Sequence, residues 1–70
     1  MPREVDARGL LCPEPVLLTK RELDQMSGGT LKVLVSNQAA RENVTRLAES
    51  RGWSVSVTNE GSDIILLLTK

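Results

Sequence analysis

Cys12 is the only cysteine in the 70-residue chain, and it begins the segment Cys12-Pro13-Glu14-Pro15. Proline is favoured at the first position of a helix, because its fixed φ suits the helix and its missing N–H would be unpaired there anyway. Pro13 therefore places Cys12 at or beside the N-cap of a predicted helix. A thiol at that end lies near the positive end of the helix dipole, which favours the nucleophilic thiolate.

The second proline of this segment limits that effect. A cap side chain accepts hydrogen bonds from the second and third helical N–H groups. With Pro13 first, the third residue is Pro15, which has no N–H, and the remaining donor belongs to Glu14, whose carboxylate opposes a nearby anion. We expect a modest lowering of the Cys12 pKa, to which Arg8 can add as the nearest basic residue. A lightly held sulfur suits a group that is handed on, although a small buried hydrophobe explains a lone cysteine equally well.

Composition excludes several other kinds of chemistry. The chain has no histidine and one cysteine, so it can form no zinc site, no Cys-His pair and no internal disulfide, and we expect neither a metal nor a cofactor. A lone cysteine fits a reducing compartment, and no signal peptide or membrane-length apolar run is present, so we expect a cytoplasmic protein. Nine basic and nine acidic side chains with one aromatic residue argue against direct nucleic-acid binding.

Hydrophobic periodicity predicts six elements that would position the cysteine. Alternation of polar and apolar residues predicts strands over residues 3–7, 31–36, 53–58 and 63–69, with a turn at residues 59–62. Helical spacing predicts one helix from Pro13 to about Met26, ended by Gly28-Gly29, and a second that is capped by Ser36 or Asn37 and ends near Gly52.

The resulting order, βαβαββ, predicts the fold class. We expect a single domain over residues 1–70, an α/β (α+β) two-layer sandwich with a mixed four-stranded sheet and both helices on one face. The helix faces expected to pack on the sheet are Val16, Thr19, Leu23 and Met26, widened by Leu17, and then Ala40, Val44, Leu47 and Ala48. Trp53 is expected to anchor the core.

The last strand also predicts an apolar group on the uncovered face of the sheet. If Ile64, Leu66 and Leu68 face the helices, then Ile65 and Leu67 point to the other face, alongside Leu34. Scattered surface leucines need no explanation, but the group could equally form a partner surface or a weak dimer through the open sheet face.

The segment from Asp6 to Pro15 resembles the signature of the TusA/SirA family of small sulfur-carrier proteins. That signature is a Cys-Pro-x-Pro motif, preceded by a Gly-Leu-x segment and placed directly after the first strand, in a fold of the predicted order. Residues 37–52 are more similar to the amino-terminal domain of YedF-like proteins, a branch associated by name with selenium metabolism and often followed by a further domain.

The resemblance implies that Cys12 carries sulfur as a persulfide. A donor such as a cysteine desulfurase or a rhodanese-like protein would supply it, and a downstream acceptor protein would remove it, in tRNA thiolation, cofactor synthesis or selenium metabolism. Pro13 and Pro15 would fix the loop and the helix start, and Gly9 would permit a tight approach at the strand exit.

Three charged residues near the motif are candidates for partner contact. Asp6, Arg8 and Glu14 are close enough in sequence to shape the surface that a partner meets, although solvated turn residues explain them equally well. The expected protein is a carrier without independent turnover. The alternative is a non-catalytic interaction or regulatory module with a structural cysteine, and slow or blocked alkylation of Cys12 would identify it.

Overall fold

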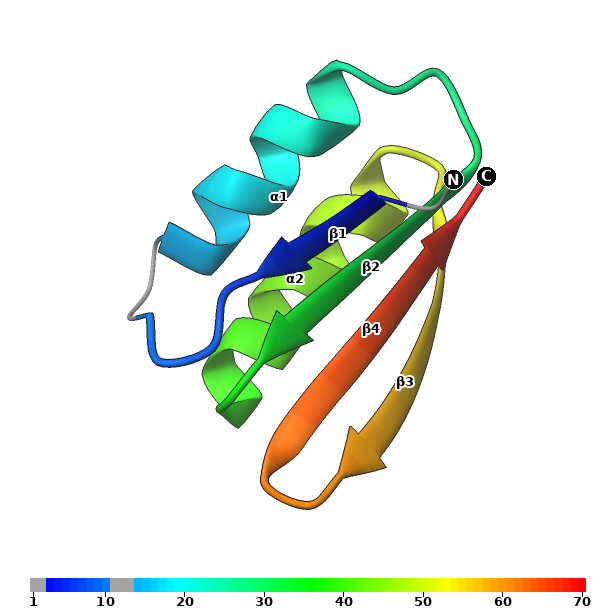
Figure 1. Cartoon of the computed structure of the whole chain (residues 1–70). Coiled ribbons are helices and arrows are strands. Elements are labelled where there is room, and N and C mark those ends of the chain that lie inside the picture. The colour runs from blue at the N-terminus through cyan, green and yellow to red at the C-terminus, as the bar shows by residue number, and fades with distance from the viewer. Residues whose placement is uncertain (1–2, 11–13) are drawn as a thin grey trace.

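The computed structural model describes residues 3–10 and 14–70. Its elements follow the predicted order, and both helices lie on the same face of the sheet (Figure 1). They are β1 (Arg3–Asp6), α1 (Glu14–Asp24), β2 (Thr30–Val35), α2 (Gln38–Ser50), β3 (Ser54–Glu60) and β4 (Asp63–Thr69). The predicted two-layer fold with a mixed sheet is confirmed.

The four strands are arranged in the order β1-β2-β4-β3. β1 pairs with β2 in parallel, and β4 pairs antiparallel with both β2 and β3. Because β4 lies between β2 and β3, the two central strands carry the buried residues Leu31, Val33, Leu66 and Leu68. β3 is an edge strand, and most of its side chains are exposed.

The face that α1 turns to the sheet includes the predicted residues: Thr19 and Leu23 are buried, and Val16 and Met26 pack against the core. Pro15 is buried as well, whereas Leu17 is 52% exposed. Residues four apart lie on one face of a helix, and a residue two positions from Pro15 is turned by about 200° from it. The expectation that Leu17 widens the core stripe is therefore wrong. The helix also ends at Asp24, before the predicted end at Met26 and Gly28-Gly29.

α2 begins and ends with the predicted capping residues. Asn37 is the N-cap, and its Oδ1 accepts the N–H of Ala40 at 2.8 Å. At the other end Gly52 has φ +82, and the N–H groups of Gly52 and Trp53 donate to the carbonyls of Glu49 and Ala48. This pattern is a Schellman motif, in which glycine adopts the left-handed conformation without the penalty of a Cβ.

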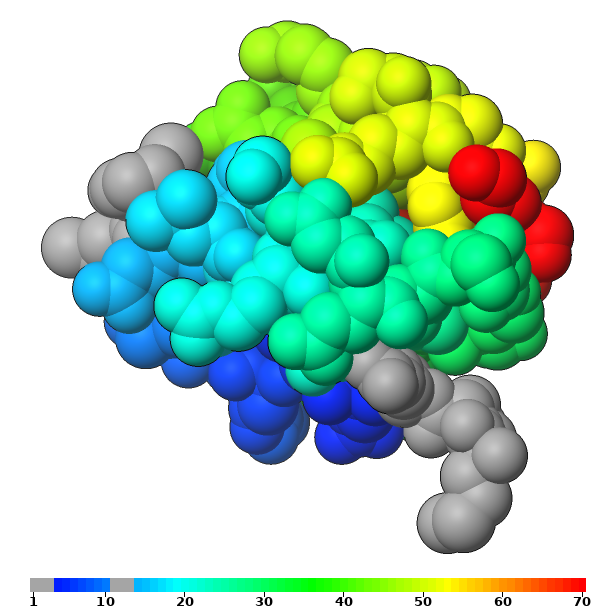
Figure 2. Space-filling view, turned by 90° about the horizontal axis from the view of Figure 1, so that it is seen from above, coloured from blue at the N-terminus to red at the C-terminus, as the bar shows by residue number. Residues whose placement is uncertain are grey.

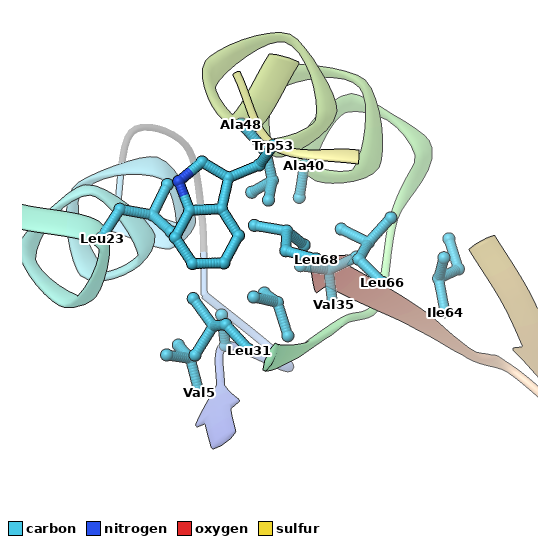
Figure 3. Packing of buried hydrophobic residues seen from close by; sticks show 13 residues of the cluster. Val5, Leu23, Leu31, Val35, Ala40, Ala48, Trp53, Ile64, Leu66 and Leu68 are labelled. Carbon is cyan, nitrogen blue, oxygen red and sulfur yellow. The ribbon is translucent and has the colours of Figure 1, made fainter. Parts of the chain in front are cut away.

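The indole of Trp53 fills the space between the two helices and the sheet. In Figure 3 it lies between Leu23 of α1 and Ala48 of α2, above Leu68 and Leu31. Trp53 is 4% exposed, so the prediction that it anchors the core is confirmed.

The turn between β3 and β4 is shorter than predicted. Glu60 pairs with Asp63, so that Gly61 and Ser62 alone form the loop, and Asn59 and Glu60 belong to the strand. Gly61 has φ +61, as two-residue hairpin loops require.

Candidate functional site

The described members of the predicted site lie at one end of the sheet. β1 and β2 end there, α1 and α2 begin there, and the hairpin between β3 and β4 turns there (Figure 1). Cys12 and Pro13 lie outside the described residues. The described chain approaches them through Leu10 and continues at Glu14, so these flanking segments define the site.

Arg8 is bound to two carboxylates at this end of the sheet. Its Nε lies 2.9 Å from Asp6 Oδ1, and its Nη2 lies 2.9 Å from Asp6 Oδ2. Its Nη1 donates to Asp63 Oδ2 at 3.0 Å, and its backbone N–H donates to Asp6 Oδ1 at 3.2 Å. We call Asp6, Arg8 and Asp63 the Arg8 cluster; it joins the exit of β1 to the start of β4.

The Arg8 cluster has a direct electrostatic consequence. Hydrogen bonds from the Arg8 side chain, and then from its backbone N–H, lower the pKa of Asp6 from 3.8 to about 2. The side-chain hydrogen bonds to Asp6, and next the one to Asp63, raise the pKa of Arg8. One guanidinium is thus shared by two carboxylates. The charge of Arg8, which the sequence analysis considered only as an addition to the effect on Cys12, is therefore paired within the cluster.

Backbone hydrogen bonds fasten the segment after β1. Ala7 donates its N–H to Leu34 O at 2.8 Å, and Gly9 donates to Ser36 Oγ at 2.9 Å. Gly9 has φ +78, and a Cβ built on it would meet no atom of the described residues within 4 Å. The left-handed backbone favours glycine at this position, and the expected tight approach at the strand exit stays a prediction.

The first residues of α1 play different structural parts. Glu14 is exposed at the start of the helix, where its carboxylate faces the positive end of the helix dipole. Pro15 is buried, and its carbonyl accepts a hydrogen bond from Thr19 Oγ1 at 2.8 Å. Pro15 therefore packs in the core, a part that the sequence analysis missed.

The exposed side of α1 carries an apolar and a basic residue next to the motif. Glu14, Leu17, Leu18 and Arg21 line a shallow hollow, which we call the α1 hollow. The helix lies beside α2 on the surface of the helical layer (Figure 2, cyan beside yellow-green). Arg21 forms no ion pair within the described part of the chain. Sequence reasoning missed this surface because it placed Leu17 in the core.

The uncovered face of the sheet contains the predicted apolar group. Leu34 pairs with Ile65 in the register, and Leu67 is opposite Lys32. Leu67 is 41% exposed, but Leu34 is only 9% exposed. The apolar strip is therefore narrow.

Within residues 3–10 and 14–70, no group of three or more histidine, cysteine, aspartate or glutamate side chains could hold a metal ion. Neither described helix is long and apolar enough to cross a bilayer.

Known proteins resemble this chain over nearly all of its length. The family model described as "Sulfurtransferase TusA" matches residues 3–70. A putative sulfur carrier protein of Methanocaldococcus jannaschii is 37% identical over 59 residues, which are 83% of this chain and 79% of that protein. A putative sulfur carrier protein of Bacillus subtilis is 31% identical over 62 residues, which are 87% and 83% of the two chains.

A solved structure extends the likeness to the fold. The crystal structure of a SirA-like protein from Desulfitobacterium hafniense has a TM-score of 0.89 with this chain at 30% identity, and the match covers 99% of this chain and 96% of the other. Sequence and fold thus agree on one group of relatives.

Proposed function

The chain belongs to the TusA family of sulfur carriers, and from that premise we propose that Cys12 carries sulfane sulfur as a persulfide between two protein partners. The observation that carries the proposal is the family match over residues 3–70, which includes the one cysteine of the chain. No other side chain here can form a persulfide.

The exchange is a transfer without net oxidation. The Cys12 thiolate attacks the outer sulfur of a persulfide on the donor, the donor's S–S bond breaks, and the donor's thiolate leaves. Sγ of Cys12 then holds the outer sulfur until an acceptor nucleophile attacks it and releases the Cys12 thiolate. Because the chain has no second thiol, the acceptor of the sulfur must be a group on another molecule.

Both partners must approach the same end of the molecule. A cysteine desulfurase or a rhodanese-like protein is the donor class that fits, and a downstream sulfur-acceptor protein takes the sulfur away. The exposed side of α1, with Glu14, Leu17 and Arg21, supports partner contact directly after the motif. Asp6 and Arg8 bind each other instead, so their side chains are less available to a partner.

Three finer points extend the proposal. We place the exchange in the cytoplasm, where thiols stay reduced. The same thiol can carry selenium, and the product can be a thiolated tRNA or a cofactor.

The strip of Leu34, Ile65 and Leu67 is the surface on which two copies would form a weak dimer. A molecular mass that stays that of one chain, measured by light scattering at rising protein concentration, would exclude this dimer.

The test is the intact mass of the protein after incubation with a cysteine desulfurase and L-cysteine, without reductant. The chain should gain one sulfur atom, which dithiothreitol removes. The Cys12→Ala variant should gain none, and its unfolding should match that of the wild type to show that it is folded.

Alkylation of Cys12 separates the two ways in which this test can fail. A chain that gains no sulfur although iodoacetamide modifies Cys12 readily requires a different donor, such as a rhodanese-like protein. A chain that gains no sulfur and whose Cys12 resists alkylation is no carrier, and an interaction module with a structural cysteine then explains it better.

A further inference from the structure

We propose that Arg8 and Asp63 form a positioning pair, which fixes the loop leading to Cys12 for sulfur transfer. The proposal rests on the proposed function of Cys12. It assigns Arg8 a task inside the molecule, in place of partner contact, and it brings in Asp63, a residue 55 positions away.

The geometry of the Arg8 cluster supports a positioning task. The guanidinium lies in a fork on both oxygens of Asp6, which fixes its plane, and its remaining terminal nitrogen reaches Asp63 at 3.0 Å. A guanidinium can form such directed bonds on two sides at once, whereas a lysine ammonium is a point charge without a fixed plane. The orientation of Arg8 is therefore determined by two strands.

The position of the Arg8 cluster indicates which segment of the chain it would fix. β1 has four residues and pairs only with β2, so the exit of this edge strand gains little support from the sheet. Gly9 is fastened to Ser36, the residue after β2, and Arg8 is fastened to Asp63, the first residue of β4. Together these bonds tie the segment before Cys12 to both central strands.

The solvent exposure of the Arg8 cluster indicates that it affects the position of the loop more than the stability of the fold. The side chains of Arg8, Asp6 and Asp63 are 45%, 52% and 34% exposed. Ion pairs at such exposed positions add little to the free energy of unfolding. Persulfide exchange, in contrast, depends on the alignment of three sulfur atoms, and a small misplacement slows such reactions strongly.

The first measurement needs no partner. Amide exchange at Gly9 is compared by NMR in the wild type, Asp63→Asn and Arg8→Lys, with Asp24→Asn as the control. Asp24 is a matched choice, because it is similarly exposed and, like Asp63, pairs with an arginine, Arg51; it also lies near Lys20. Exchange at Gly9 should accelerate about tenfold in the first two variants and stay unchanged in the control. Unchanged exchange at Gly9 in Asp63→Asn would overturn the proposal.

The second measurement separates positioning from partner contact. Single-turnover loading of Cys12 is followed against the concentration of a cysteine desulfurase charged with L-cysteine. In Asp63→Asn and Arg8→Lys the maximal rate should fall about tenfold, with the half-saturating donor concentration unchanged. A raised half-saturating concentration at an unchanged maximal rate would mean that these residues contact the partner, and the proposal would be wrong.

The wild type distinguishes this failure from that of the proposed function. A wild-type chain that takes up no sulfur on Cys12 contradicts the carrier proposal and, with it, any part of the Arg8 cluster in transfer. A wild-type chain that loads normally, with variants that load at the same maximal rate, contradicts only the positioning pair.

Discussion

Gly9 donates its N–H to Ser36 Oγ across 2.9 Å, which binds the segment after β1 to the residue that follows β2. The bond joins residues 27 positions apart at the end of the sheet where both strands stop. It also holds a glycine whose φ of +78 few other residues adopt. This bond and the glycine conformation thus add to the bonds of Arg8 in fixing the segment after β1.

Gly9→Ala should destabilise the protein by about 1 kcal/mol, because alanine is strained at a left-handed φ. A methyl group there meets no atom of residues 3–10 and 14–70 within 4 Å, so a clash with these residues adds nothing to this cost. Gly61→Ala is the matched control: its φ is +61, and its Cβ would also meet open space. Urea unfolding should show similar losses for both variants, whereas loading of Cys12 should slow only in Gly9→Ala. Equal loading rates would contradict a role of the loop.

Leu66 and Leu67 are neighbours on β4 with opposite surroundings, and their truncation should differ accordingly. Leu66 is fully buried, so Leu66→Ala should cost about 2–5 kcal/mol. Leu67 is 41% exposed on the uncovered face, and Leu67→Ala should change the free energy of unfolding by about 0.5 kcal/mol. The fluorescence of the buried Trp53 reports unfolding in both variants. Similar losses would mean that the register of β4 is wrong.

The strands and the second helix could be predicted because their hydrophobic patterns allow only one assignment of the buried face. Period-two alternation assigns Leu31, Val33 and Val35 to one face, and a shift by one residue would bury Lys32. In α1 the predicted positions Thr19 and Leu23 are buried, but the run Val16-Leu17-Leu18 does not indicate on which side the apolar stripe widens. The buried Pro15 lies on the same face as Thr19, and Leu17 is turned to solvent.

The site could be predicted only where its residues are close in sequence. Gly9, Arg8 and Asp6 stand beside Cys12 and were identified by that proximity. Asp63 reaches Arg8 because β4 is inserted next to β2, a strand order that local patterns do not contain. The pairing of Arg8 with Asp63 could therefore be recognised only from the three-dimensional structure.

The pH dependence of stability should reveal the bond between Asp6 and Arg8. Hydrogen bonds from Arg8 lower the pKa of Asp6 from 3.8 to about 2 in the folded chain. Between these two values the unfolded chain binds more protons, so stability falls as the pH falls. The contribution of Asp6 is complete above its unfolded pKa and is lost as the pH falls through about 2.

Asp6→Asn tests this window directly. The urea midpoints of the wild type and the variant should differ slightly at about pH 6, because the pair is exposed, and converge as the pH falls below about 2, where the wild type also loses the charge. Glu60→Gln is the control, since Glu60 forms no ion pair among the described residues. A wild-type curve parallel to that of Asp6→Asn across this range would show that the bond does not form in solution.

The α1 hollow should determine how strongly a sulfur donor binds. Leu17 is 52% exposed and Arg21 lies one turn further along the helix, so an apolar side chain beside an acidic group on the donor would complement them. Arg21→Glu should raise the half-saturating concentration of a cysteine desulfurase about tenfold and leave the maximal loading rate unchanged, because a surface charge acts on encounter.

A charge reversal on the other helix controls for the general effect of charge. Arg46 is exposed on α2, and Arg46→Glu changes the net charge of the chain by the same amount. If both reversals weaken donor binding equally, the donor responds to net charge and the α1 hollow is not its contact. If Arg21→Glu alone weakens binding, and added salt reduces the difference between the wild type and this variant, the contact is local and electrostatic.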